Sequence, residues 1–258
     1  MNLTAAQFRK LSDLVYHQSG IHLAEGKQNL LQARLSKRFR ALGLTSVNEY
    51  FRRLEEDDRE MVAFLDAVST NHTFFFRESH SFQFLHEHHL AIWCAASSSG
   101  EEPYSVAIHC LEKGFQPSIL ATDISTKMLA AGEKGVYESD KGKDIPPELL
   151  KKYFQKGVGS NNGLIRVKER VKRMVTFRRF NLLTDNPPTE RFDVIFCRNV
   201  LIYFDRTVKE VVINRLYGAL KPCGYLIVGG AESLHNLRHP YRYVAPSIYL
   251  KPHAPHRT

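Results

Sequence analysis

Two short segments combine residue types that suit the binding of a nucleoside. In the first, an apolar run at residues 91–94 is followed by small residues at 95–100 and by a predicted helix. Small residues there let a ligand approach backbone N–H groups at the start of a helix. In the second, Asp123 follows another apolar run and lies 23 residues beyond Gly100. A carboxylate that binds ribose hydroxyls is expected about 20 residues beyond such a loop. Because G-x-G-x-x-G is absent, we expect nucleoside rather than dinucleotide binding, with helix capping as the alternative role of Asp123.

These segments lie in a part of the chain where short apolar runs alternate with helical patterns. The apolar runs lie near residues 91–94, 119–122, 192–197 and 225–229. The helices that separate them begin near residues 102, 125 and 206. Alternation of this kind predicts an α/β fold with a doubly wound sheet. The small-residue loop and the acid would then lie at the carboxyl edge of that sheet.

The first part of the chain has a helical pattern instead, and we predict an N-terminal helical domain over residues 1–70, followed by the α/β domain over residues 71–258. Its helix from about residue 27 to 42 places apolar side chains on one face, namely Leu31, Leu35, Phe39 and Leu42. Four basic side chains fall within about 100 degrees of one another on its flank, namely Lys27, Arg34, Lys37 and Arg38. This flank is either a solvated face or a docking surface for an acidic partner.

Residues from about 153 to 180 interrupt the alternation. A Gly-rich turn at 157–163 precedes a stretch with seven basic residues, Arg166, Lys168, Arg170, Lys172, Arg173, Arg178 and Arg179. We predict a small antiparallel β-subdomain inserted in the α/β domain, with a second positive surface.

The composition limits the class of protein but does not identify its binding partner. The 258 residues include 36 Lys and Arg against 27 Asp and Glu, a net charge of +9, and such charge attracts nucleic acid, anionic membranes and acidic proteins alike. No apolar run approaches the ~18 residues of a membrane span, and the N-terminus lacks the regions of a signal peptide. The four cysteines fit neither a metal pair nor a disulfide framework. We expect a cytoplasmic protein without membrane insertion and, lacking a heptad pattern, a monomer.

Five ordered blocks together resemble the chemotaxis receptor methyltransferases, the CheR family. They are Asn71-His-Thr-Phe-Phe-Phe-Arg-Glu78, Ser98-Ser-Gly-Glu-Glu-Pro-Tyr-Ser105, Ala121-Thr-Asp-Ile124, Phe180-Asn-Leu-Leu183 and Phe192-Asp-Val-Ile-Phe-Cys-Arg-Asn-Val-Leu-Ile-Tyr-Phe-Asp205. The resemblance implies a Rossmann-like class I methyltransferase sheet of seven strands, an all-helical N-terminal domain and an inserted β-subdomain. It further implies S-adenosylmethionine as cofactor, S-adenosylhomocysteine as product, and methyl ester formation on glutamate side chains of chemoreceptors.

The resemblance also implies nine cofactor-binding residues. They are Asn71, Thr73 and Arg77 around the methionine end, Glu102 and Asp123 near the amino and ribose groups, Asn181 and Leu182 by the adenine, and Arg198 and Asn199 closing the pocket. A cofactor that bears a carboxylate, an ammonium, a sulfonium and a ribose needs an arginine, acids and amides, and these types are present.

Two of the residues in these blocks are candidate catalytic residues. The resemblance places Tyr203 and Arg77 near the transferring methyl, where either could orient the acceptor carboxylate. A glutamate carboxylate with a reference pKa near 4.3 is already ionised at neutral pH, so no general base is required. The alternative roles are structural: a core position for Tyr203, and an ion pair with Glu78 or Glu101 for Arg77.

Partner contacts follow from the two basic surfaces. The methylated regions of chemoreceptors are acidic helical bundles, so the flank of the 27–42 helix would steer and align them. Some members of the family also add the receptor's C-terminal peptide as an extra strand on the β-subdomain, which tethers the receptor. The candidate contacts there are Gly157, Gly159, Arg166 and Lys168.

The sequence also bears on two other functions and on a possible metal site. A nucleic-acid methyltransferase should carry Asn-Pro-Pro-aromatic after the later strand, whereas Asp185-Asn-Pro-Pro188 precedes it and predicts a turn. A module that senses S-adenosylmethionine or a second messenger without catalysis is the other alternative, although nothing visible disables the site. The run His86-Glu-His-His89 lacks H-E-x-x-H spacing, so no metal is expected. The segment between Phe84 and Ala91 is shorter than usual for the family.

Overall fold

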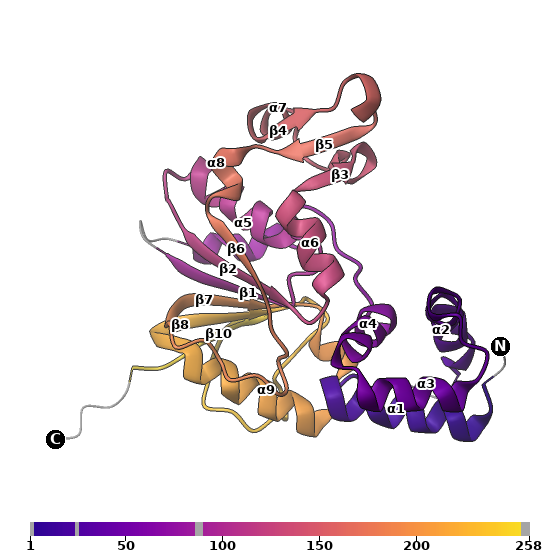
Figure 1. Ribbon diagram of the computed structural model, residues 1–258. Helices are drawn as coiled ribbons and strands as arrows, with labels where there is room; N and C mark the ends of the chain where they lie inside the picture. The colour runs from indigo at the N-terminus through magenta and orange to yellow at the C-terminus, as the bar shows by residue number, and fades with distance from the viewer. Residues whose placement is uncertain (1–2, 24–25, 86–89, 254–258) are drawn as a thin grey trace.

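Capping residues set the ends of the N-terminal helices in the computed structural model, which describes residues 3–23, 26–85 and 90–253. Thr4 forms a capping box with Gln7 at the start of the first helix, and Gly20, with φ of 75°, ends it. The helices are α1 (Ala5–Ser19), α2 (Gln28–Leu42), α3 (Val47–Glu56) and α4 (Asp58–Val68). They enclose their own core, which contains the predicted apolar face of α2, and they form one side of the molecule in Figure 1.

Arg38, on α2, is part of the packing between these helices. Its guanidinium donates to both carboxylate oxygens of Glu60, a residue only 4% exposed, and the hydroxyl of Tyr50 donates to the same carboxylate at 2.8 Å. The hydrogen bonds to Glu60 raise the pKa of Arg38, and burial together with Glu60 raises the pKa of Tyr50. The sequence prediction placed Arg38 on a docking flank and missed this role, because the buried acid lies on a different helix.

Seven strands form the central sheet, in the order β6-β2-β1-β7-β8-β10-β9. They are β1 (Ala91–Ala95), β2 (Ser118–Asp123), β6 (Val175–Arg179), β7 (Phe192–Cys197), β8 (Leu220–Val228), β9 (Arg242–Ala245) and β10 (Ile248–Leu250). The first five in that order pair in parallel, and β10 is antiparallel to both of its neighbours. The predicted α/β sheet is confirmed. Its strand order reverses between β1 and β7, where sheets of this kind bind ligands.

Helices cover both faces of this sheet. They are α5 (Glu101–Glu112), α6 (Thr126–Lys134) and α9 (Arg206–Ala219), and α9 lies on the face opposite α5 and α6 (Figure 1). Alternate residues of β1 accordingly enter different cores, with Ile92 and Cys94 in one and Trp93 and Ala95 in the other. In the described part of the chain, no helix combines the length and the apolar character needed to cross a membrane.

A second, smaller sheet stands at the top of Figure 1. Its strands are β3 (Val136–Glu138), β4 (Phe154–Lys156) and β5 (Leu164–Val167), paired antiparallel in the order β3-β5-β4, and α7 (Pro147–Tyr153) precedes β4. The predicted small antiparallel sheet is therefore present, and two of its strands, β4 and β5, lie within residues 153–180. Its third strand, β3, begins at residue 136 and was missed, because a strand of three residues is too short to show alternation. Residues 175–179 form β6 of the central sheet instead.

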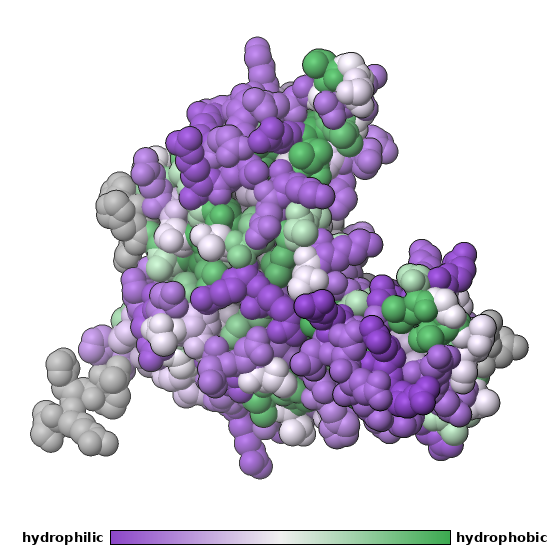
Figure 2. Space-filling view, in the orientation of Figure 1, coloured by the Kyte–Doolittle hydropathy of each residue, from purple (hydrophilic) through white to green (hydrophobic). Residues whose placement is uncertain are grey.

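Several basic residues of this small sheet are engaged within the protein. Lys168 and Arg170 donate to the carbonyl oxygens at the end of α7, and Arg166 pairs with Glu169 at 2.8 Å. The surface over the small sheet is nevertheless mostly hydrophilic (Figure 2). The remaining short helices are α8 (Glu169–Lys172), η1 (Ser79–Phe84), η2 (Ser139–Gly142), η3 (Gly159–Asn161) and η4 (Leu201–Tyr203).

Candidate functional site

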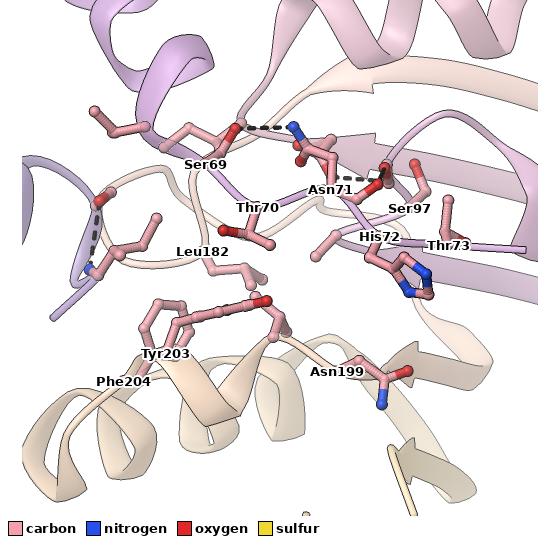
Figure 3. A pocket seen from close by; sticks show the side chains of 18 of the residues that line it. Ser69, Thr70, Asn71, His72, Thr73, Ser97, Leu182, Asn199, Tyr203 and Phe204 are labelled. Atoms are coloured by element: carbon pink, nitrogen blue, oxygen red, sulfur yellow. Dashed lines mark hydrogen bonds between the residues drawn. The ribbon is translucent and has the colours of Figure 1, made fainter. Parts of the chain in front are cut away.

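A cavity lies at the carboxyl ends of β1, β2 and β7, where the helical part meets the central sheet (Figure 3). Every predicted cofactor-binding or catalytic residue lines it: Asn71, Thr73, Arg77, Glu102, Asp123, Asn181, Leu182, Arg198, Asn199 and Tyr203. These residues are spread over more than 130 positions of the chain, and they converge because the strands that precede several of them are neighbours in the sheet.

The loop between β1 and α5 follows a tight path along the cavity. Its backbone is left-handed at Ala96, Ser98 and Gly100, with φ of 67°, 49° and 93°. The N–H of Ser98 donates to the carboxylate of Asp123 at 2.8 Å, which ties the loop to the end of β2. A Cβ on Gly100 would lie 3.1 Å from Cα of Gly132. The small residues therefore serve both the tight turn and the close packing of α5 against α6.

Asp123 ends β2 and is 6% exposed. One carboxylate oxygen accepts the N–H of Ser98, and the other accepts the N–H of Ser125 at 2.9 Å. Burial raises the pKa of Asp123, and these two N–H groups oppose the rise. Ser125, not Asp123, is the N-cap of α6. Because each carboxylate oxygen accepts more than one hydrogen bond, Asp123 retains capacity for the hydroxyls of a ribose.

A buried ion network around Arg198 forms another wall of the cavity. The Arg198 side chain, 1% exposed, donates to Glu102 at 3.0 Å, to Glu78 at 3.1 Å and to the carbonyl oxygen of Arg77 at 2.6 Å. Burial raises the pKa of Glu102, with Arg198 opposing the rise. Burial alone would raise the pKa of Glu78 as well, but hydrogen bonds from the Gly230 N–H and from Arg198 outweigh it and lower the pKa. The network fixes the backbone that carries Arg77.

Two residues that line the cavity each have a buried polar side-chain atom without a hydrogen-bond partner among the described residues. These atoms are Oγ of Ser97 and Nε of Arg198. Leaving a buried donor or acceptor unsatisfied costs about 1–3 kcal/mol, so a bound molecule that offers polar groups at these positions would recover that energy. The cavity therefore fits a cofactor with carboxylate, amino and ribose groups.

Asn181 connects the cavity to the helical part. Its Nδ2 donates to the carbonyl oxygen of Gln18 at 2.6 Å, and its Oδ1 accepts the N–H of Leu183 at 3.0 Å. The side-chain amide is thus engaged within the protein, a role that the sequence prediction did not include. Leu182 presents its side chain to the cavity beside Tyr203 (Figure 3).

Tyr203 lies at the end of η4, and its side chain points into the cavity toward Thr70 and Leu182 (Figure 3). Asn199, in the same segment, has a left-handed backbone with φ of 58°. Its side chain points away from Tyr203, and its Nδ2 lies 3.5 Å from Oε1 of Glu78. The single turn of η4 therefore presents the phenol to the cavity while the amide faces the Arg198 network.

The helical part supplies a wall of the cavity that sequence reasoning missed. Ile21, His22 and Leu30 line it, and the N–H of His22 donates to the carbonyl oxygen of Tyr203 at 2.9 Å. Contacts of this kind join residues far apart in the chain, 163 positions in the case of Asn181 and Gln18. No spacing in the sequence signals them.

The four basic residues of the predicted docking flank lie in different environments. Arg34 lines the cavity and donates to the carbonyl oxygens of Val68 and Ser69, which fixes the connection out of α4. Arg38 is bound to Glu60, as described above. Lys27 and Lys37 are exposed, and Lys27 also lines the cavity. Lys27 and Lys37 are thus the flank residues best placed to meet a partner.

No group of three or more His, Cys, Asp or Glu side chains within residues 3–23, 26–85 and 90–253 is arranged to hold a metal ion. The histidine run at 86–89 lies outside the described residues. It makes up most of the short segment before β1, of which only Leu85 and Leu90 are described.

The strand order, the acid at the end of β2 and the cavity at the switch point, together with the matching family domain, define an S-adenosylmethionine-dependent methyltransferase of class I. More specifically, the chain belongs to the CheR family. The family domain described as "CheR methyltransferase, SAM binding domain" matches residues 71–249, and "CheR methyltransferase, all-alpha domain" matches residues 6–69.

Characterised relatives resemble the chain over nearly its full length. "Chemotaxis protein methyltransferase" of Salmonella typhimurium is 39% identical, over 96% of this chain and 90% of that protein. The protein of the same name from Escherichia coli is 37% identical, over 96% and 91%. "Chemotaxis protein methyltransferase 2" of Pseudomonas aeruginosa is 38% identical, over 95% and 93%.

These comparisons confirm the family resemblance of the five sequence blocks, the methyltransferase activity and the use of S-adenosylmethionine. They give no support to a nucleic-acid methyltransferase or to a non-catalytic sensing module.

Proposed function

We propose that the protein is a cytoplasmic protein-glutamate O-methyltransferase that converts glutamate side chains of chemoreceptors into methyl esters. The observation that carries the proposal is the convergence of all ten predicted cofactor-binding and catalytic residues on one cavity. The names of the relatives, chemotaxis protein methyltransferases, support the assignment to chemotaxis.

The residues around the cavity suit methyl transfer to a carboxylate. S-adenosylmethionine, when bound, supplies an electrophilic methyl group on its sulfonium. We assign Asp123 to the ribose hydroxyls, Asn71 and Thr73 to the methionine end, and the phenol of Tyr203 and the guanidinium of Arg77 to the acceptor carboxylate. Holding the carboxylate in line and excluding water can supply several kcal/mol of the lowering of the barrier.

The acidic side chains at the cavity favour an acceptor that needs no general base. Glu102 is paired with Arg198, and Asp123 accepts two backbone N–H groups, so neither carboxylate is poised to remove a proton. A glutamate acceptor is already ionised at neutral pH. Neither of these two acids is therefore expected to deprotonate an amine or a hydroxyl acceptor, whereas a carboxylate acceptor needs no such step.

The exposed basic residues near the cavity suit an acidic helical partner. Lys27 and Lys37 lie on or beside α2, which itself contributes Leu30 and Arg34 to the wall of the cavity. The outline of the molecule is hollowed between the helical part and the small sheet (Figure 2). We assign this side of the molecule to the receptor's methylated helices, with the lysines providing steering.

The small sheet offers edges for a tethering peptide. Both β3 and β4 are edge strands, and Val136 on β3 and Val158 near the turn are 41% and 79% exposed. A receptor's C-terminal segment could add as a strand along one of these edges. Gly157 and Gly159 shape the adjacent turn: a Cβ on Gly157 would lie 1.9 Å from the carbonyl oxygen of Asn161. If a receptor without its C-terminal tail binds as tightly as the intact one, this tethering role is wrong.

We further propose that the helical domain over residues 1–70 docks the receptor, that the domain over residues 71–258 performs the transfer, and that the protein acts as a monomer. Sedimentation with and without receptor fragments would test the last point, because a stable dimer would contradict it.

Transfer of radiolabelled methyl groups from S-adenosylmethionine to chemoreceptor-containing membranes tests the function directly. We expect label that base releases, because carboxyl methyl esters hydrolyse in base. Arg77→Ala and Asp123→Ala should each remove it. Base-stable label, or label on nucleic acid, would overturn the proposal, and cofactor binding without transfer would favour a sensing role.

A further inference from the structure

Glu232 is a buried carboxylate at the cavity end of the sheet that neither the resemblance nor the motif analysis singled out. It lies just beyond β8 and is 7% exposed. Its Oε2 accepts the N–H of Asn199 at 2.8 Å and the N–H of Gly229 at 2.7 Å, and its Oε1 accepts the N–H of Ile202 at 3.2 Å. One side chain thus joins the loops that follow two neighbouring strands, β7 and β8.

The packing around this carboxylate is close. A Cβ on Gly229 would lie 2.5 Å from Nδ2 of Asn199, 2.8 Å from Oε2 of Glu232 and 3.0 Å from the N of Asn199. The N–H of Glu232 donates in turn to the carbonyl oxygen of Gly229 at 2.8 Å. The glycine therefore leaves the space that lets the carboxylate reach the loop after β7.

A second carboxylate holds the same loop from another side. Glu78 accepts from the guanidinium of Arg198 at 3.1 Å and from the N–H of Gly230 at 2.8 Å. Glu78 therefore acts on the side chain that precedes Asn199, whereas Glu232 acts on the backbone of Asn199 and of η4. Tyr203 is the last residue of η4, so the backbone that Glu232 holds is the one that aims the phenol.

We propose that Glu232 is a positioning residue for methyl transfer, which acts through Tyr203 by fixing the backbone from Asn199 to η4. This inference rests on the proposed function, in which Tyr203 orients the acceptor carboxylate. Because Oε2 of Glu232 accepts two hydrogen bonds and Oε1 accepts one, both atoms must be acceptors. A carboxylate meets this requirement, whereas an amide does not.

The variant Glu232→Gln is therefore a conservative test, because it keeps the shape and removes one acceptor. At least one of the three N–H groups then faces an NH2 group instead of an oxygen. A displacement of about 1 Å at a reacting group can cost as much as about 100-fold in rate, so we expect kcat for receptor methylation to fall roughly tenfold or more. The KM for receptor should change less than about threefold. The affinity for S-adenosylhomocysteine, measured by calorimetry, should fall less than kcat does. The exposed Glu190→Gln makes the same chemical change and should leave all three unchanged.

A double-mutant cycle with Tyr203→Phe separates positioning from a general effect on the fold. If Glu232 acts through the phenol, Glu232→Gln should cost less than about twofold in the Tyr203→Phe background. The same fold-loss in both backgrounds, or an unchanged kcat in Glu232→Gln, would overturn the proposal.

Hydrogen exchange gives a readout that needs neither receptor nor cofactor. In Glu232→Gln, the amides of Asn199 and Ile202 should exchange faster, while those of α9 keep their protection. Gly229→Ala disturbs the same contact from the other side and should have the same effect on exchange and on kcat, so the test does not depend on one variant folding. Unchanged exchange in both variants would overturn the proposal. Failure of the proposed function would look different: the wild-type protein itself would give no base-labile label.

Discussion

Asp123 combines a structural role with a proposed ligand-binding role, since it accepts two backbone N–H groups and also lines the cavity. Asp123→Asn should weaken binding of S-adenosylhomocysteine by about 10- to 100-fold, because hydrogen bonds to a charged group contribute roughly 1.5–3 kcal/mol. Titration calorimetry measures the change. Asp144→Asn, at an exposed position, serves as the control. An affinity within about twofold of the wild type in a folded Asp123→Asn protein would remove Asp123 from the cofactor site.

Glu78 makes the stability of the protein depend on pH. Its pKa in the folded state lies below the ordinary value of 4.5, so its ionised form stabilises the fold above that value, and this contribution disappears as the pH falls through the lowered folded pKa. Because the side chain is 26% exposed, solvent weakens the effect, and we expect Glu78→Gln to cost about 1 kcal/mol at pH 7.

The difference in unfolding free energy between wild type and Glu78→Gln should narrow as the pH falls from about 5 toward 3. Urea denaturation at several pH values measures it. A difference that stays constant over this range would mean that Glu78 stabilises the fold by packing alone.

At the scale of the element, two adjacent residues of α2 should behave in opposite ways. Removing one partner of a buried ion pair costs about 3–5 kcal/mol, and the side chain of Arg38 is 27% exposed, so we expect Arg38→Ala to lower the unfolding free energy by about 3 kcal/mol. Lys37 is exposed, and Lys37→Ala should change stability by less than about 0.5 kcal/mol. Urea denaturation of both variants is the measurement. Similar losses in the two variants would contradict the assignment of Arg38 to the packing of the helices.

Elements with long, clear patterns could be predicted from the sequence, and short ones could not. The apolar runs of β1, β2 and β7 and the face of α2 have enough residues to show their period. By contrast, β3 has three residues, and β6 has the same apolar pattern whether it joins the small sheet or the central one. In the structure, β6 pairs with β2 and so belongs to the central sheet. This pairing depends on tertiary contacts, which the local sequence pattern does not encode.

The same distinction applies to the site. Residues inside the recognisable blocks, such as Arg77 and Tyr203, could be predicted because the resemblance carried them. The contributions of Ile21 and His22 depend on how the helical part packs on the sheet, and Glu232 depends on two loops meeting. Such contacts have no signature in spacing or composition.

At the scale of the whole molecule, the net charge of +9 should appear as a salt dependence of receptor methylation. Raising the ionic strength from ~0.05 M to ~0.5 M shortens the screening length several-fold, so we expect kcat/KM for receptor to fall at least about threefold. The affinity for S-adenosylhomocysteine should change less than twofold, because the cofactor lies in a cavity that screening reaches less.

Substitution of the exposed lysines of the flank tests whether this salt dependence comes from the proposed receptor contact, and Lys113→Gln is the control. Lys27→Gln combined with Lys37→Gln should flatten the salt dependence. Lys113→Gln, at an exposed position at the opposite end of α5 from the cavity-lining Glu102, should not. A salt dependence unaltered by the double substitution would place the receptor contact elsewhere on the surface.

The hydrogen bonds from Asn181 to Gln18 and from His22 to Tyr203 make the N-terminal helices a structural part of the cofactor cavity. This has a consequence for evolution and for engineering. A chimera that receives the helical domain of a relative would exchange part of the wall of the cavity as well as the surface that we propose to face the receptor. We therefore expect such an exchange to alter cofactor affinity together with receptor preference. A successful graft has to retain the residues of α1 and of the turn after it that meet Asn181 and Tyr203.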